Sequence, residues 1–172
     1  MPCLRSVCLP IALLCGCSPT LDWRQVRPVG LDLEAMFPCR PATLSRGVML
    51  GQRRVEIAMH ACATGGSTYA VGVAALEDVR DVGAAMMALR DAAARNVGSS
   101  TVETEAIQVP GMTPHAEAAR VVLTGNRPDG TPVVEHLAVF ARGARVYHAL
   151  VVGDRPDTDA VSAFFSGLRV GP

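Results

Sequence analysis

The feature that most constrains the fold is a series of short segments in which apolar and polar residues alternate. Such segments occupy residues 43–50, 53–63, 68–76, 101–109, 117–124, 133–141 and 145–152. An earlier segment carries Leu31 and Leu33 and runs into Phe37-Pro38. A period of two is typical of β-strands that bury one face. The Gly, Pro, Asn and Asp residues between the segments favour turns, so the chain predicts a run of antiparallel strands.

Two other segments have a helical period. Between Asp78, a plausible N-cap, and Gly98, apolar residues recur at spacings of three and four. A shorter helix is predicted to start at Pro156-Asp157. The apolar residues of the two helices are Val79, Val82, Met86, Leu89 and Ala93, then Val161, Phe164, Phe165 and Leu168. We therefore predict an α+β domain, in which one antiparallel β-sheet is covered by the mid-chain amphipathic helix and the C-terminal helix.

The first residues have the order of an export signal. Arg5 is followed by an apolar stretch from Val7 to Cys15 and by the small residue Gly16. The stretch is far shorter than the roughly 20 residues that a membrane-spanning helix needs. We predict that residues 1–16 are a cleaved signal, residues 17–28 a polar tether and residues 29–172 a single domain.

The end of this signal, Leu14-Cys15-Gly16-Cys17, resembles the lipobox of bacterial lipoproteins. The resemblance implies that Cys17 carries a diacylglycerol, and two or more acyl chains would hold the protein stably on a membrane. Ser18, rather than Asp, follows Cys17, which by the same resemblance favours the outer membrane with the domain facing the periplasm. The alternative is an ordinary cleaved signal with incidental cysteines. In the tether, Trp23 would sit at the lipid interface or pack on the edge of the domain.

Two of the six cysteines, Cys39 and Cys62, lie outside the predicted signal and anchor. An even pair in an oxidising compartment predicts one disulfide. A hairpin folded about Gly51-Gln52 brings Cys62 opposite residues 39–41, which favours the same pairing. Closing that loop would stabilise the fold by about 3 kcal/mol. The alternative is two buried free thiols.

The charge balance bears on the class of partner. Arg5 leaves with the predicted signal, so 15 Arg residues face 16 Asp and Glu residues in the mature chain, which contains no Lys. No basic stripe is evident, and nucleic acid is not a predicted partner.

The domain also resembles the PsbP-like (DcrB-like) superfamily across residues 29–170. The resemblance is carried by Phe37-Pro38-Cys39-Arg40-Pro41, by the mid-chain amphipathic helix and by the terminal segment Ala163-Phe164-Phe165-Ser166-Gly167-Leu168. It implies a non-enzymatic scaffold or binding domain without shared catalytic residues.

Candidate chemistry is limited to histidines. His136 and His148 have the same parity around the Arg142–Ala144 turn, so we expect them on one face of adjacent strands. They could hold a metal if Glu103 or His60 supplied a third ligand. The alternative is two histidines on a half-wet sheet face, since no HxH, HxxxH or CxxC spacing occurs. No catalytic residue and no cofactor are predicted.

Together these patterns predict an outer-membrane-anchored, non-catalytic binding or assembly module whose partner is another envelope protein. One alternative is a small-ligand pocket between the sheet and the mid-chain helix, lined by Met59, Met86, Met87, Phe140 and Phe164, although methionines also fill ordinary cores. The other alternative is a histidine-dependent metalloenzyme.

Overall fold

The computed structural model describes residues 21–50, 53–99 and 101–171. The strands are β1 (Arg24–Val26), β2 (Leu33–Phe37), β3 (Ala42–Leu50), β4 (Arg53–Thr64), β5 (Ser67–Ala75), β6 (Thr101–Ala106), β7 (Ala119–Asn126), β8 (Pro132–Arg142), β9 (Arg145–Gly153) and β10 (Arg169–Val170). The helices are α1 (Val82–Val97), preceded by a single 3-10 turn at Val79–Asp81, and α2 (Thr158–Ser166). The predicted signal, Cys17 and the Gly51-Gln52 turn lie outside the described residues.

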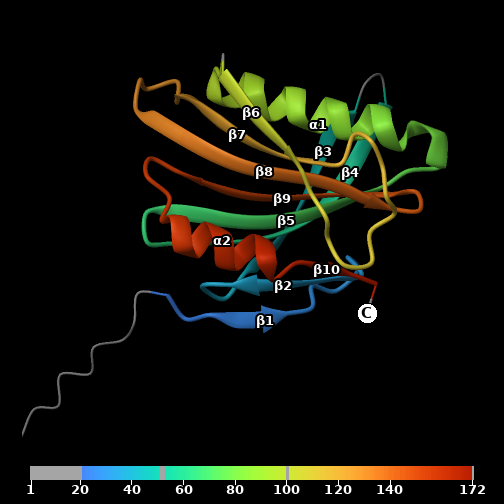
Figure 1. Ribbon diagram of the computed structural model, residues 1–172, viewed down its shortest axis with the longest axis horizontal. Helices are drawn as coiled ribbons and strands as arrows, with labels where there is room; N and C mark the ends of the chain where they lie inside the picture. Colours follow the sequence, from blue (N-terminus) through green and yellow to red (C-terminus); the bar gives the residue numbers. More distant parts are fainter. Residues whose placement is uncertain (1–20, 51–52, 100, 172) are drawn as a thin grey trace, which may run out of the picture.

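A seven-stranded antiparallel sheet forms the middle of the molecule, in the order β3-β4-β5-β9-β8-β7-β6 (Figure 1). Most neighbours are consecutive strands joined by turns. In the turn between β4 and β5, Gly65 and Gly66 both have a positive φ, which suits a two-residue hairpin. Only the central β5–β9 pair joins distant segments. The sheet is thus two meanders that meet at β5 and β9, with α1 on the connection between them.

The helix α1 covers one face of this sheet (Figure 1). The residues that α1 buries are Val82, Ala85, Met86, Ala93 and Val97. They pack on aliphatic side chains of the sheet such as Ile57, Leu123 and Leu137. Gly98 ends the helix in the left-handed conformation, and Asp78 caps the 3-10 turn by accepting a hydrogen bond from Arg80 N. We call this side of the sheet the α1 face.

The opposite face, which we call the α2 face, is covered by α2 together with a second sheet (Figure 1). This three-stranded antiparallel sheet has the order β1-β2-β10. The central strand β2 buries Leu33, Ala35 and Phe37 against the large sheet. The molecule is therefore layered as helix, large sheet, and then helix beside small sheet.

The predicted fold class is wrong. Strands account for 49% of the structure and helices for 19%, in two antiparallel sheets rather than one sheet covered by two helices. The second sheet escaped prediction because β1 and β10 are three and two residues long, too short to show alternation. β1 also lies within residues 17–28, the segment predicted to be the tether.

The predicted Cys39–Cys62 disulfide is confirmed. The two Cα atoms are 6.0 Å apart, within the usual range for a bridge. The predicted register is also correct, because Ala61 pairs with Ala42 and so places Cys62 opposite residue 41. The bridge joins the segment after β2 to β4, and it thereby ties the small sheet to the large one. Trp23 packs edge-on against Tyr69 on this side of the domain.

Candidate functional site

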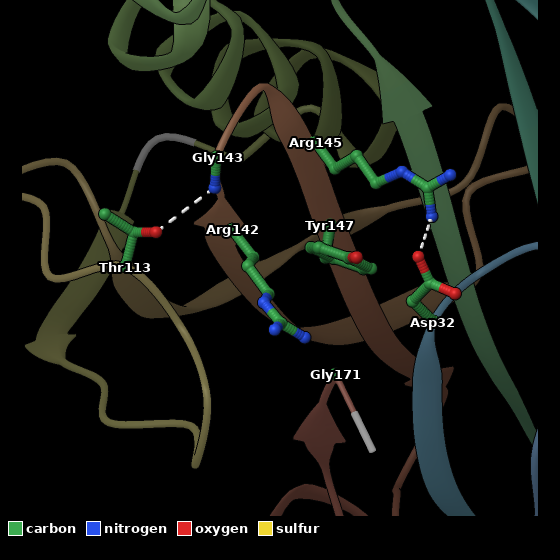
Figure 2. A pocket seen from close by; sticks show the side chains of 7 residues that line it. All are labelled: Asp32, Thr113, Arg142, Gly143, Arg145, Tyr147 and Gly171. Carbon is green, nitrogen blue, oxygen red and sulfur yellow. Dashed lines mark hydrogen bonds and ion pairs between the residues drawn. The ribbon is translucent and has the colours of Figure 1, made fainter.

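An open hollow of about 680 Å³ lies where four separate segments meet (Figure 2). We call it the arginine cleft. Its lining residues are Asp32, Thr113, Arg142, Gly143, Arg145, Tyr147 and Gly171. They come from the segment before β2, the loop between β6 and β7, the β8–β9 hairpin and the end of β10.

Two arginines belong to the β8–β9 hairpin, and in Figure 2 Arg145 extends toward Asp32 whereas Arg142 extends toward Gly171. Arg142 and Arg145 are direct cross-strand partners, so their side chains share one face of the sheet. Asp32 accepts a hydrogen bond from Arg145 at 2.5 Å and neutralises that charge. Arg142 has no carboxylate partner among the residues that the structure describes. The described residues therefore give the cleft a net charge of one positive unit.

The aromatic ring of Tyr147 lies between these charges, as Figure 2 shows. The ring is fully buried and stacks on Phe140 at a centroid distance of 5.4 Å. Its hydroxyl is buried and donates no hydrogen bond within the described part of the chain. Burial raises the pKa of this phenol, and the Arg145 guanidinium, which can donate to the phenol oxygen, acts in the opposite direction. Tyr147 thus presents a neutral hydroxyl whose proton has no acceptor among the described residues.

The rim of the cleft is fixed by backbone contacts. The Thr113 hydroxyl accepts a hydrogen bond from Gly143 N at 3.1 Å, and Thr113 N donates to Ala141 O. Gly171 N donates to Asp32 O at 2.9 Å. A Cβ atom at Gly171 would lie 0.9 Å from Arg142 Nη1, so a larger residue would push this guanidinium out of its present position, and the φ of +67° at Gly171 also favours glycine. The segment after β10 therefore fixes the backbone at Asp32 and borders the Arg142 side chain.

The expectation that His136 and His148 share a face is wrong. Arg142 pairs with Arg145, so an even-numbered residue of β8 opposes an odd-numbered residue of β9. His136 therefore opposes Val151 on the α2 face, whereas His148 opposes Val139 on the α1 face. Among the described residues, no three His, Cys, Asp or Glu side chains are close enough together to hold a metal ion.

His148 and Glu135 are buried on the α1 face. Burial lowers the pKa of His148 to about 4 and raises the pKa of Glu135 to about 7. The imidazole lies against Gly72, and its Nδ1 has no hydrogen-bond partner in the described structure. Such perturbed values accompany many active sites, but here the two groups are separated along their strands and neither lines the arginine cleft. Between pH 4 and 7 both are mainly uncharged groups of the core.

His60 and Glu103, the suggested third ligands, are placed far from a common centre. His60 lies on β4, where its Nδ1 is 3.2 Å from the Thr43 hydroxyl, and burial lowers its pKa. Glu103 is exposed on β6, which lies at the opposite edge of the sheet from β3 and β4.

The residues predicted to line a pocket under α1 do not meet. Met59 and Met86 belong to the α1 face, and Met86 is fully buried. Phe140 and Phe164 are fully buried on the α2 face. Met87 is exposed. The proposed lining is therefore ordinary packing on two sides of the sheet.

The arginine cleft was missed because its parts are far apart in the sequence. The one local signal was the presence of two arginines at the predicted Arg142–Ala144 turn, Arg142 within it and Arg145 directly after it. The structure ends β8 at Arg142 and starts β9 at Arg145, which makes the two residues cross-strand partners. No sequence pattern near the two arginines indicates that Asp32 and Gly171 lie beside them in the fold.

No helix in the described part of the chain is both long and apolar enough to cross a bilayer. Comparison with protein-family models finds no match, and neither does comparison with curated proteins. The PsbP-like domain and the lipobox therefore remain predictions that rest on the sequence pattern.

Proposed function

We propose that this chain is a lipoprotein of the bacterial outer membrane whose domain faces the periplasm and binds a ligand or partner without catalysis. Cys17, at the end of the Leu14-Cys15-Gly16-Cys17 motif, would carry the lipid. The Cys39–Cys62 disulfide supports this location, because structural disulfides persist in oxidising compartments.

The binding role rests on one observation, the arginine cleft. Four segments converge there, and among the described residues no carboxylate neutralises Arg142, which lies beside the buried Tyr147. Ligand sites are concave and use a few precisely placed polar or charged groups to orient the ligand, and the arginine cleft has both features. The metalloenzyme alternative has no comparable support, because its two histidines lie on opposite faces of the sheet.

The anchor is tested by expressing the full chain in a bacterium and separating inner and outer membranes on a density gradient. We expect the wild type in the outer-membrane fraction, with a lipid-modified Cys17 detected by mass spectrometry. Cys17→Ser should abolish the modification and remove the mature protein from membranes. Cys15→Ser is the matched control, because it keeps a small residue in the motif and should leave the anchor intact. Unchanged membrane partition of Cys17→Ser would contradict the proposal.

A further inference from the structure

We propose that the arginine cleft binds the phosphate group of a soluble phosphorylated compound. The inference deepens the proposed binding role and rests on it, but not on the lipid anchor. It is carried by the two guanidinium groups, the Tyr147 hydroxyl and the position of Asp32.

The charge arrangement of the cleft calls for an anion. Like charges directly opposite each other on two strands destabilise a sheet. Arg142 and Arg145 occupy such positions, and Asp32 is the carboxylate that relieves the repulsion. It contacts Arg145, and the 64% exposure of its side chain leaves it accessible to solvent and to a competitor. A second anionic group would complete the neutralisation.

The Tyr147 hydroxyl adds an independent reason. A buried donor without a partner is costly and uncommon in folded proteins. The hydroxyl belongs to a fully buried ring at the floor of the cleft, between Arg142 and the Arg145–Asp32 pair (Figure 2). An oxygen atom of a ligand held between the two arginines would supply the missing acceptor once their side chains adjust.

The number of donors favours phosphate over carboxylate. A carboxylate has two oxygens, which one guanidinium fork can occupy fully. A phosphate monoester has three strong acceptor oxygens and a charge close to −2 at pH 7. It can therefore accept from Arg142, Arg145 and Tyr147 together, whereas the carboxylate of Asp32 reaches Arg145.

The position of the cleft favours a soluble ligand over the headgroup of the anchoring bilayer. Gly171, which lines the cleft, is near the C-terminal end, and residue 21 is the first described residue on the side of the proposed anchor. Figure 1 shows the blue start of the described chain at one end of the β1–β2 layer and the C-terminal end of the chain at the other end. A chain anchored through its N-terminal end would direct the cleft away from the surface to which it is attached.

Asp32 then acts as an internal competitor for Arg145. It adopts a left-handed backbone conformation with φ +47°, which is uncommon outside glycine and is found at functional sites. A phosphate that contacts Arg145 must displace its carboxylate. Removing the Asp32 charge should therefore strengthen phosphate binding, the opposite of what a purely supporting residue would do.

The test is isothermal titration of the detergent-solubilised full protein with glycerol 3-phosphate and inorganic phosphate at constant ionic strength. We expect Arg142→Gln to weaken binding at least tenfold and Tyr147→Phe to weaken it several-fold, while Asp32→Asn strengthens it several-fold. Arg155→Gln, an exposed arginine at the other end of β9, should stay within twofold of the wild type. Circular dichroism checks that each variant is folded.

Three outcomes would overturn the inference. The first is equal phosphate affinity in wild type and Arg142→Gln, and the second is weaker binding in Asp32→Asn. The third is binding to phosphatidylglycerol vesicles without binding to either soluble phosphate, which would assign the cleft to a bilayer headgroup. Membrane fractionation of the same preparations separates these failures from a failure of the proposed anchor.

Discussion

The two faces of the large sheet are built from different side chains. The chain has one Trp, two Tyr and four Phe residues, and all of them pack on the α2 face. The α1 face is closed by one helix that buries valine, alanine and methionine side chains. The disulfide also lies on the α2 side, where it joins β4 to the segment after β2.

This difference shows how one sheet can carry two hydrophobic cores, one whose stability depends mainly on side-chain shape and one whose stability depends on pH. The α2 face holds large rings in edge-to-face contact and a covalent link, so its stability depends on shape. The α1 face buries His148 and Glu135 beneath a single helix, and the shifted pKa values of these two groups make its stability depend on pH. Near-ultraviolet circular dichroism reports on the α2 face alone, because the aromatic rings are all there.

The largest effect is expected from Phe164→Ala. This ring contacts Phe37, Tyr69 and Phe165, with centroids 5.4 to 5.6 Å apart. Its removal leaves a cavity between α2 and both sheets, and it should lower the free energy of unfolding by about 4 kcal/mol. Urea denaturation followed by far-ultraviolet circular dichroism measures the change.

The matching substitution on the other face is Met86→Ala, since Met86 is the fully buried methionine of α1. We expect a smaller loss, about 2 to 3 kcal/mol, because fewer atoms are removed. A larger loss for Met86→Ala than for Phe164→Ala would reverse the comparison between the faces.

The disulfide should contribute somewhat less than the aromatic cluster. Cys39→Ala combined with Cys62→Ala frees a loop with a sequence separation of 23 residues, and the chain-entropy model gives a loss of about 3 kcal/mol. Reducing the wild type should produce the same shift in the urea midpoint. Hydrogen exchange should rise mainly in β2, whose link to β4 is lost. Equal exchange in β2 and α1 would argue against a local role.

The pH dependence of stability distinguishes the α1 face. The pKa of His148 is about 4 in the folded protein and 6.5 as the reference value, so His148 makes stability fall as the pH drops from 6.5 toward 4. The pKa of Glu135 is about 7 against 4.5, so Glu135 makes stability fall as the pH rises from 4.5 toward 7. The two slopes oppose each other and should nearly cancel between these two groups. His60 and His136 are on the α2 face, and burial lowers their pKa values as well, so they add a smaller slope of the same sign as that of His148.

Removing either group should expose the slope of the other. Between pH 4.5 and 6.5, Glu135→Gln should gain about 2 kcal/mol of stability as the pH rises, and His148→Gln should lose a similar amount. Urea titrations at several pH values measure both slopes. The double variant is the control, and its profile should run parallel to that of the wild type, with the slope that His60 and His136 contribute. Single variants with equal slopes would show that the α1 face does not shift the pKa values of both groups.

Local pattern was sufficient to predict most of the large sheet, both helices and the disulfide. The strands around the β3–β4 hairpin alternate clearly, and their register followed from the turn, which is why Cys39 and Cys62 could be paired. The short strands β1 and β10 owe their conformation to β2, whose backbone they pair with. Their sequence alone contains too few residues to specify a strand.

Side-chain sites were harder to predict because face assignment depends on exact register. His136 and His148 were placed together by parity, but the direct pairing of Arg142 with Arg145 reverses that parity across the hairpin. A shift of one residue in a turn moves every side chain of a strand to the other face. The arginine cleft depends in addition on Asp32 and Gly171, which only the folded chain brings near the hairpin.

The smallest expected effect concerns Arg120, the charged group in contact with the aromatic rings of the α2 face. Its guanidinium lies 4.6 Å from the centroid of Phe165 and also pairs with Glu105 at 3.3 Å. The side chain of Glu105 is 66% exposed, so this ion pair should be weak. The contact with Phe165 is better shielded from water, since the Arg120 side chain is 25% exposed.

Arg120→Met keeps the apolar stem and removes the charge, so it should lower the free energy of unfolding by about 1 kcal/mol, whereas Glu105→Gln should lower it by less than about 0.5 kcal/mol.

The Arg120→Met variant has a second readout, the pKa of His136. Burial, and after it the charge of Arg120, lowers the pKa of His136. Arg120→Met should therefore raise that pKa toward 6.5, as followed by NMR titration of the imidazole. Two results together would contradict this view: an equal loss of unfolding free energy in Glu105→Gln and Arg120→Met, and an unchanged pKa of His136 in Arg120→Met. The surface ion pair would then matter more than the ring contact, and the stability of the α2 face would depend on charge as well as on shape.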